Sequence, residues 1–407
     1  MKWLTRERAG AMLSDLIARP SVNPMGRLHS SATPVERGVV EYVEGLFAGR
    51  DARVTRLPVS DVHENLLIEY PADGSGPAIL FESHMDVVPA DDWADEAFVP
   101  RREGDLLIGR GACDDKGSLT AMILALLDLI EAGERPPRPV LLLCAGDEEY
   151  AQTGIKSFCG LPFDIRWGIF GEPTRLEPVV QHKGTLRWDF TVHGRSAHTS
   201  RPELGANAIL GAIGAVEALS RLQKDLQRRF ASPLMTGPLL TVSMIRGGRT
   251  RNAVPDECVV SVDFRLLPGM DMQAARSEAM AVIDDACSRT GEDLRATHSD
   301  LQLRTPALST PLDHPFSRQT LEICRTYAGP EVDLRGEPYG TDAAWVADRA
   351  AALVLGPGDI RSAHAVGERI DLNEVVTCAR IYRAIMTAPP PQLTGPSTAL
   401  PGGVHPA

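Results

Sequence analysis

The sequence has no excess of positive charge. Its 407 residues contain 42 lysines and arginines against 54 aspartates and glutamates, which gives a formal net charge of −12 at pH 7. Proteins that bind nucleic acids or anionic membranes need a basic face for the phosphate groups of their partners. We therefore expect neither a nucleic acid nor a membrane among the partners of this protein.

The sequence also has no apolar segment long enough to cross a bilayer. The longest apolar stretch, residues 119–130, contains Asp128 and is shorter than the ~20 residues that a transmembrane helix requires. Residues 1–20 have no continuous apolar core of the kind found in secretory signals. The seven cysteines show no paired spacing, which is typical of free thiols in a reducing compartment. These features predict a cytoplasmic protein.

What the sequence does have is a regular alternation of strand-like and helix-like segments. Residues 118–132 form an almost completely apolar helical segment, which predicts a buried helix. The alternation predicts an α/β domain with a mostly parallel sheet and helices on both faces. Short apolar runs typical of strands covered on both faces are 65–69, 78–82, 140–145, 167–170 and 351–355.

The middle of the chain follows a different order. A strand at 186–193, a helix, two strands, a helix and a weaker strand at 293–303 give the β-α-β-β-α-β order of a ferredoxin-like domain. Residues 388–407 are rich in Pro, Gly and Ser, which predicts a disordered tail. We therefore predict a discontinuous larger domain at 1–182 and 305–387, an inserted α+β domain at 183–304 and a tail at 388–407.

Clusters of acidic and histidine residues follow the apolar runs of the larger domain. Open α/β sheets bind their ligands at this edge, where the strands end. The clusters are SHMD at 83–86, GRGACDDKG at 109–117, DEE at 147–149, GEPT at 171–174 and GPGDIRSAH at 356–364. Their positions predict that these side chains meet in one site.

The first two clusters have both a functional and a structural interpretation. His84 and Asp86 point to the same side of an extended chain, so His84 can bind a metal while the carboxylate orients its ring. A simple His–Asp hydrogen bond at a strand end is the alternative. Asp114 occupies the position where a dinucleotide-binding GxGxxG motif needs its third glycine. The dinucleotide motif therefore fails, and what remains is a glycine-rich turn that presents two carboxylates. One of them could bridge two metals, or Asp114 or Asp115 could simply cap the following helix.

The remaining clusters complete a set of metal-ligand types. In the DEE cluster one carboxylate can bind metal while another takes a proton from water, although a solvated acidic turn is the alternative. Two histidines with three or four carboxylates suit a co-catalytic pair of zinc ions. Cys113 is interpreted as a small buried spacer rather than a ligand. We find no Ser-His-Asp arrangement that would supply a covalent nucleophile.

Taken together, these motifs resemble one family. The sequence is similar to the di-zinc amidohydrolases and exopeptidases that include acetylornithine deacetylase, succinyl-diaminopimelate desuccinylase, aminoacylase and glutamate carboxypeptidase. The resemblance covers about residues 5 to 387. It rests on PSVNP (20–24), SHMDVVPADDW (83–93), GRGACDDKG (109–117), DEE (147–149), GEPT (171–174), GRSAH (194–198), RNAVPDECVVSVDFRLLPG (251–269), YGTDA (339–343) and GPGDIRSAHAVGE (356–368).

The resemblance implies a metal-ligand set. His84, Asp114, Glu149, Glu172 and His364 would hold two Zn²⁺ ions per subunit, which Co²⁺ or Mn²⁺ can replace. Asp114 would bridge the two ions. The larger domain would be the catalytic domain of the di-zinc exopeptidase type, and the insert would serve as its lid and as a dimerisation domain.

The resemblance also implies roles in catalysis and substrate binding. Asp86 would orient a histidine ligand, and Glu148 would be the general base and acid. His198 would reach the active site of a partner subunit and stabilise the oxyanion there. Arg265 would bind a substrate carboxylate bidentately, and Asn252 would make a second substrate contact. The alternatives are a surface histidine, a structural ion pair of Arg265 with Asp263 or Glu257, and a turn asparagine.

The C-terminal motifs narrow the expected substrate. Residues 340–343 and 353–368 look most like acetylornithine deacetylase, which implies hydrolysis of the amide bond of an N-acyl-L-amino acid by a homodimer. Asp115 stands where the family more often has Met, a form that also occurs in its peptidase branch. A carboxypeptidase, a dipeptidase or a succinyl-diaminopimelate desuccinylase is therefore the alternative. A binding protein that has lost the chemistry would have a broken ligand set or a replaced Glu148, and this sequence has neither.

Overall fold

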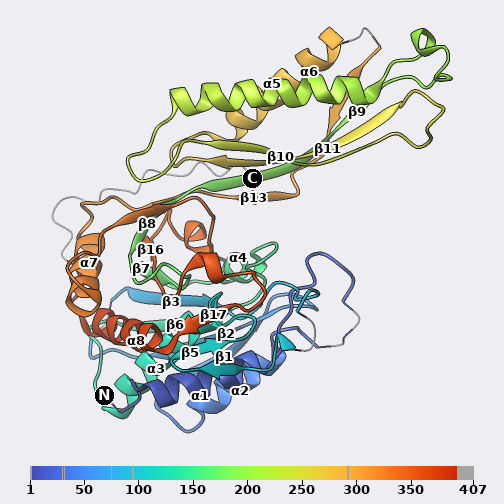
Figure 1. Ribbon diagram of the computed structural model, residues 1–407. Helices are drawn as coiled ribbons and strands as arrows, with labels where there is room; N and C mark the ends of the chain where they lie inside the picture. Colours follow the sequence, from blue (N-terminus) through green and yellow to red (C-terminus); the bar gives the residue numbers. More distant parts are fainter. Residues whose placement is uncertain are drawn as a thin grey trace. The chain divides into compact units, whose positions relative to one another are not determined.

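The computed structural model describes residues 2–29, 31, 33–74, 76–93, 96–290 and 293–391 (Figure 1). Residues 392–407, most of the predicted tail, lie outside this part. The chain divides into two compact units. The first unit comprises Met1–Val180, Thr310–Arg335 and Thr341–Ala407, and the second comprises Gln181–Ser309 and Gly336–Gly340.

The first unit is built on a large sheet whose central strands are parallel. These neighbouring strands are β6 (Val140–Ala145), β3 (Ala78–His84), β7 (Ile165–Phe170) and β16 (Ala351–Val354). Almost every residue in them is buried, as expected for strands covered on both faces. Antiparallel strands extend the sheet on both sides: β2 (Glu64–Tyr70) and β1 (Arg53–Pro58) beyond β6, and β8 (Val179–His182) beyond β16. β14 (Leu308–Ser309), which belongs to the second unit, and β15 (Arg335–Glu337), most of which does, pair with β8.

Helices cover this sheet (Figure 1). One layer contains α1 (Arg6–Ile17), α3 (Lys116–Glu131) and α8 (Leu372–Thr387), which pack against one another, and α7 (Pro315–Ala328) packs on α8. α2 (Arg37–Phe47) packs against β1 and β2. On the opposite side from α3 lie α4 (Thr153–Cys159) and the 3₁₀ turn η3 (Asp342–Trp345). Every residue of α3 from Lys116 to Leu129 is buried, so the prediction of a buried helix is confirmed.

The sequence pattern did not indicate all elements. η3 is a single turn, where Thr341 accepts a hydrogen bond from the N–H of Ala343. β1 and the small sheet β17–β5–β4 were not predicted, because β1 is only partly buried and the other three strands have three residues each, so none of them forms a long apolar run. The small sheet consists of Arg369–Asp371, Leu106–Ile108 and Arg101–Glu103, and η4 (Ile360–Ser362) precedes it.

The second unit has the predicted ferredoxin-like order. Its antiparallel sheet has the strand order β10–β11–β9–β12, and β13 also pairs with β9. α5 and α6 pack together and against this sheet, so alternate residues of β11 point into one apolar core. The predicted strand at 293–303 is two short strands, since Ser299 and Gln302 donate their N–H groups to β9 on either side of a bend. The elements are β9 (Gly184–His193), η2 (Pro202–Leu204), α5 (Ala208–Arg229), β10 (Leu239–Gly247), β11 (Glu257–Leu266), α6 (Met272–Thr290), β12 (Arg295–His298) and β13 (Leu303–Thr305).

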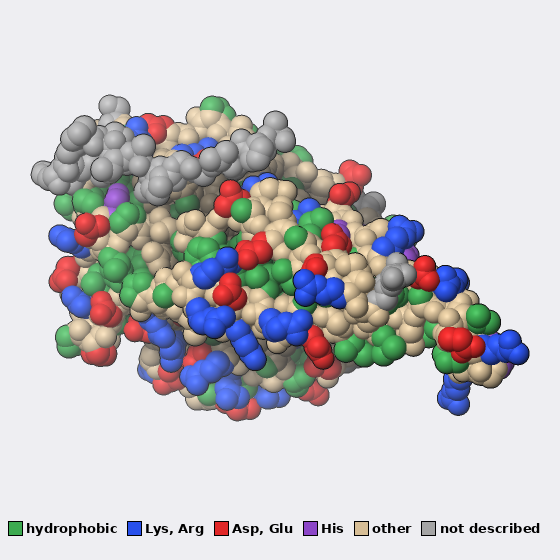
Figure 2. All heavy atoms as spheres, turned by 90° about the horizontal axis from the view of Figure 1, so that it is seen from above, with side chains coloured by type: hydrophobic (Ala, Val, Ile, Leu, Met, Phe, Trp, Pro, Cys, Tyr) green, Lys and Arg blue, Asp and Glu red, His purple; other side chains and the backbone are tan. Residues whose placement is uncertain are grey.

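Two further features concern the charges on the surface and the hydrophobicity of the helices. On the face that Figure 2 shows, acidic and basic side chains are interspersed rather than gathered by sign. Among the described residues, no helix combines the length and the hydrophobicity that crossing a bilayer requires.

Candidate metal centre

The acidic and histidine clusters of the first unit meet at the edge where its parallel strands end. His84 is the last residue of β3, Glu148 and Glu149 follow β6, and Glu172 follows β7. Asp114 lies in the loop that leads into α3. Because β6, β3 and β7 are parallel neighbours, their carboxyl ends bring these side chains to one edge of the sheet.

Asp114 lies between two histidines. Its Oδ1 is 3.0 Å from Nε2 of His84, and its Oδ2 is 3.2 Å from Nε2 of His364. The same nitrogen of His364 is 3.2 Å from Oε1 of Glu149. One carboxylate therefore faces an imidazole with each of its oxygens, which is the arrangement that a bridging ligand between two metal ions requires.

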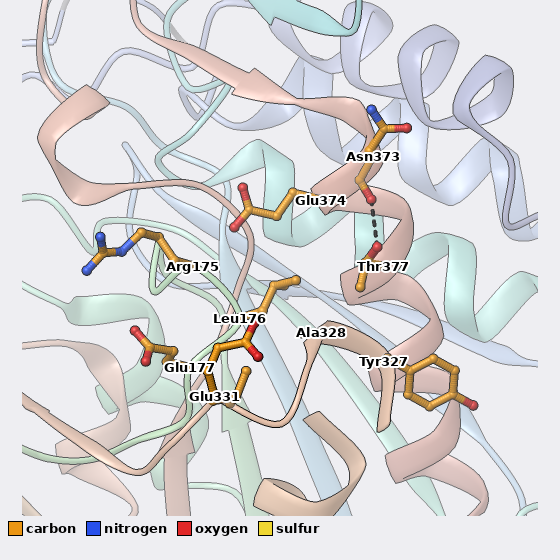
Figure 3. Close-up of a pocket in the computed structure, with 10 residues that line it drawn as sticks. Arg175, Leu176, Glu177, Tyr327, Ala328, Glu331, Asn373, Glu374 and Thr377 are labelled. Atoms are coloured by element: carbon orange, nitrogen blue, oxygen red, sulfur yellow. Dashed lines mark hydrogen bonds between the residues drawn. The ribbon is translucent and has the colours of Figure 1, made fainter. Parts of the chain in front are cut away.

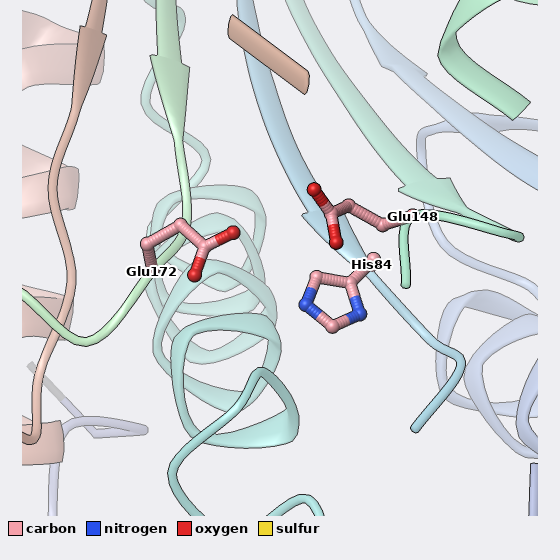
Figure 4. A group of neighbouring side chains, drawn as sticks. All are labelled: His84, Glu148 and Glu172. Atoms are coloured by element: carbon pink, nitrogen blue, oxygen red, sulfur yellow. The ribbon is translucent and has the colours of Figure 1, made fainter. Parts of the chain in front are cut away.

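Two overlapping groups of side chains could each hold a metal ion. The donor atoms of His84, Asp114 and Glu149 lie within 4.8 Å of one another, and so do those of His84, Glu148 and Glu172. Figure 4 shows the second group, with the carboxylates of Glu148 and Glu172 turned toward the ring of His84. The five predicted ligands and the predicted general base thus lie together in the structure.

The donor set fits zinc or a similar transition metal. Imidazole nitrogens and carboxylate oxygens converge here without a thiolate, which suits zinc, cobalt or manganese better than calcium. Burial raises the pKa of Glu172 well above its usual value, and burial and Asp114 raise that of Glu149 to about 7. Such crowding of buried carboxyl groups is costly unless positive charge compensates it.

Asp86 contacts His84 and also the turn that carries the two glutamates. Nδ1 of His84 lies 2.9 Å from the backbone carbonyl of Asp86 but 3.7 Å from its carboxylate. The carboxylate instead accepts hydrogen bonds from the N–H groups of Glu148 (3.1 Å) and Glu149 (3.2 Å) and from Nδ2 of Asn23 (2.8 Å). Asp86 therefore holds the turn that carries the two glutamates as well as the imidazole.

Glu368 is a structural partner of the site that the sequence analysis did not single out. Its Oε1 accepts the N–H groups of Cys113 (2.9 Å) and Asp114 (3.0 Å), and its Oε2 pairs with the buried guanidinium of Arg110 at 2.6 Å. The Sγ of Cys113 donates to the carbonyl of Asp359, 3.4 Å away, and Cys113 belongs to neither metal-binding group. The only sequence signal for Glu368 was its position at the end of GPGDIRSAHAVGE.

Asp147 belongs to a second buried network that the sequence analysis missed. Its side chain accepts hydrogen bonds from Nδ2 of Asn23 (3.0 Å) and Oγ1 of Thr153 (2.5 Å). His63 lies 3.5 Å from Asp147 and bonds Oε1 of Glu36 at 2.7 Å. Asn23 thus links the carboxylates of Asp147 and Asp86, which explains why the PSVNP stretch belongs with the catalytic motifs.

The three predicted residues of the second unit lie on or near its surface. Nδ1 of exposed His198 accepts the N–H of Ser200 at 3.1 Å, which leaves Nε2 to carry the ring proton. Asn252 lies in the exposed turn that pairs with the His198 segment. Arg265 pairs with Asp263 at 2.7 Å and donates to Thr185 at 2.9 Å, so the structural ion pair given as an alternative is present.

A pocket of the first unit lies apart from these residues (Figure 3). Its volume is about 520 Å³. It is lined by Arg175, Leu176, Glu177, Tyr327, Ala328, Glu331, Val332, Asn373, Glu374 and Thr377. Because the candidate ligands are not among its lining residues, this pocket is separate from the candidate metal centre.

Comparison with known proteins decides the family. Residues 80–388 match the model of peptidase family M20/M25/M40. The chain belongs to this family. It is 30% identical to an acetylornithine deacetylase of Pectobacterium atrosepticum over 88% of this chain and 91% of that protein. A second acetylornithine deacetylase, from Myxococcus xanthus, is 31% identical over 79% of this chain and 83% of that protein.

Solved structures show the same fold. The aminopeptidase PepT of Bacillus cereus superposes with a TM-score of 0.75 at 19% identity and covers 95% of this chain and 99% of its own. An M20 metallo-carboxypeptidase of Sulfolobus solfataricus gives a TM-score of 0.72 at 18% identity and covers 93% of this chain and 98% of its own. The predicted fold class, family resemblance and enzyme class are confirmed: the protein is an M20 family metal-dependent amidohydrolase.

Proposed function

We propose that this M20 protein hydrolyses the amide bond of an N-acyl-L-amino acid, with N-acetylornithine as the first candidate substrate. The observation that carries the proposal is the position of Asp114 between His84 and His364, with Glu148 beside them. The names of the curated relatives support the choice of substrate.

We assign the ligands by their positions around Asp114. His84 and Glu172 would hold one ion, His364 and Glu149 the other, and Asp114 would bridge both. Zinc is proposed for both ions. When bound, the metal pair supplies a Lewis acid for the amide carbonyl and makes water more acidic.

Glu148 is proposed as the group that moves the proton. Burial raises the pKa of its carboxyl well above the usual value, and the negative charge of Asp342 adds to this effect. A raised pKa makes a carboxylate a stronger base, and the same group can then return the proton that it has accepted. Glu148 would take the proton from the attacking water and deliver it to the leaving amine, while Asp86 holds its backbone N–H in place.

The residues of the second unit are proposed to bind the substrate. The Nε2–H of His198 is free to donate to a developing oxyanion, and His198 of the partner subunit would serve each active site. Arg265 would exchange Asp263 for the substrate carboxylate, which its planar guanidinium matches with two parallel hydrogen bonds. Asn252 would add a polar contact. Closure of the second unit as a lid would exclude water during the reaction.

The surface of the second unit supports a homodimer. Leu210 and Ile213 on α5, and Met244 and Ile245 on β10, are about half exposed. β10 is also an edge strand of its sheet. Exposed apolar side chains beside an unpaired strand edge are favourable for pairing with a second copy. We also propose a cytoplasmic location, which the seven free cysteines support.

The proposal is tested by measuring amine release by zinc-loaded protein. The panel contains N-acetylornithine, other N-acetyl amino acids, succinyl-diaminopimelate and dipeptides, and Glu148→Gln is the control. We expect an N-acetyl amino acid to be cleaved fastest and the control to be at least ~100-fold slower with its zinc retained. Preference for dipeptides or for succinyl-diaminopimelate would favour those alternatives, and no turnover of any substrate would refute the proposal.

A further inference from the structure

The amide of Gln152 lies between the proposed general base and an indole ring. Its Nε2 is 3.1 Å from Oε1 of Glu148, and its Oε1 is 3.0 Å from Nε1 of Trp345. Gln152 is 4% exposed. Trp345 is 193 residues away in the sequence and ends η3, so two separate segments build this contact.

The indole determines which way the amide faces. An indole N–H can only donate a hydrogen bond, so the amide oxygen of Gln152 must face Trp345. The amide NH₂ group must then face Glu148, whose Oε1 accepts the hydrogen bond. One oxygen of the Glu148 carboxylate is thereby held by the amide. In the proposed function, Oε2 would be the oxygen that takes the proton from the attacking water.

Gln152 has an unfavourable backbone conformation, and its side chain does not cap the helix that follows. Gln152 has φ 55° and ψ 35°, in the left-handed region, and it is the N-cap residue of α4. Its side chain makes no capping hydrogen bond, although capping is what side chains at this position usually provide. A left-handed non-glycine residue costs on the order of 1 kcal/mol. The chain accepts this cost at a residue whose side chain is directed to Glu148.

The indole itself is held by α4. The ammonium group of Lys156 lies 4.4 Å from the ring centroid of Trp345, and it donates to the carbonyl of Ala151 at 2.6 Å. The Sγ of Cys159 donates to the backbone carbonyl of Trp345 at 3.5 Å. Because α4 contacts both the ring and the backbone of Trp345, the indole N–H has a fixed direction.

We propose that Gln152 is a positioning residue for Glu148 and that Trp345 sets its orientation. This inference rests on the proposed function, because it gives Glu148 the role of general base. The hydrogen bond holds the carboxylate in the rotamer that faces the attacking water. Its loss lowers kcat, because the carboxylate must find that rotamer in each turnover, and leaves KM and metal binding nearly unchanged.

The experiment is a double-mutant cycle on the zinc-loaded protein. Gln152→Met keeps the length of the side chain but removes the amide, and Trp345→Phe keeps a ring but removes the N–H. We expect Gln152→Met to lower kcat roughly 10- to 100-fold, the range of one hydrogen bond to a charged group. Trp345→Phe should lower it roughly 3- to 10-fold, because the amide is then free to rotate away. In the double variant Trp345→Phe should add nothing to Gln152→Met.

Zinc content and thermal midpoint are measured for every variant, since they separate positioning from structure. Gln273→Met, the same substitution at an exposed position on α6, is the control and should match wild type. Unchanged kcat in Gln152→Met, loss confined to KM or zinc content, or additive effects in the cycle would overturn the inference. If Gln152→Met does not fold, an unchanged kcat in Trp345→Phe would by itself overturn the inference. An inactive wild type overturns the proposed function itself.

Discussion

The two units hold their candidate functional residues in opposite ways. In the first unit His84, Asp114 and Glu172 are buried, and His84, at the end of a parallel strand, belongs to one donor group with Asp114 and to another with Glu172. In the second unit His198 and Asn252 lie in exposed turns. The fold of the first unit therefore positions its site before substrate arrives, whereas the second unit presents groups that can act only when another surface meets them.

Their charged pairs differ in the same way. Arg110 and Glu368 in the first unit are fully buried, and Glu368 also holds the loop of Asp114. Arg229 and Glu278 join α5 to α6 in the second unit across a half-exposed surface. Breaking a buried pair leaves an uncompensated charge in a medium of low polarity, whereas water replaces the partner at an exposed pair. Breaking the charged pair of the first unit should thus reduce both stability and activity. Breaking the charged pair of the second unit should leave activity unchanged.

Metal removal should have the largest effect and should separate the units. A chelator should reduce activity to background and lower the thermal midpoint, because an ion that binds only the folded state stabilises it. Hydrogen exchange should rise at the ends of β3, β6 and β7 and stay unchanged in β9 and β11. Zinc should restore both activity and protection. Equal loss of protection in both units would contradict the comparison.

Glu368→Gln should destabilise the protein by about 3–5 kcal/mol, because it leaves the charge of Arg110 buried and uncompensated. Chemical denaturation measures this change. Zinc affinity should fall as well, since Glu368 accepts the N–H of Asp114. Arg110→Met combined with Glu368→Leu is the matched control, and it should recover a large part of the stability but not of the zinc affinity. If the double variant is no more stable than Glu368→Gln, a buried unpaired charge is not the cause.

Much of the first unit's site was predictable because it follows one rule. His84 ends the strand β3 and Glu172 follows the strand β7, and the carboxyl ends of parallel strands share an edge. The supporting groups follow no such rule. Glu368 reaches Asp114 across 254 residues, and Trp345 reaches Gln152 across 193, so no local pattern indicates either contact. The pairing of Arg265 with Asp263, which was stated as an alternative, joins residues i and i+2 of one strand, and such residues share a face.

His198→Ala should lower kcat roughly 100- to 1,000-fold, the range found when one oxyanion donor is removed. The thermal midpoint should hardly change, because the His198 ring is exposed and its hydrogen bonds in the described part of the chain go to the neighbouring Ser200. Mixing His198→Ala with Glu148→Gln tests where the histidine acts. If His198 of the partner subunit serves each site, subunit exchange creates one intact site per mixed dimer, and activity returns. If each histidine serves its own subunit, the mixture stays as inactive as its components.

Arg229→Met should have the smallest effect. The guanidinium of Arg229 lies 2.8 Å from Oε2 of Glu278, but both side chains remain more than a third exposed. Exposed pairs of this kind contribute about 0.2–1 kcal/mol, and the methionine retains most of the apolar stem. Denaturation should therefore show a loss below ~1 kcal/mol that shrinks further in high salt, with unchanged kcat and zinc content. A loss comparable to that of Glu368→Gln would mean that the second unit depends on buried charge as the first unit does.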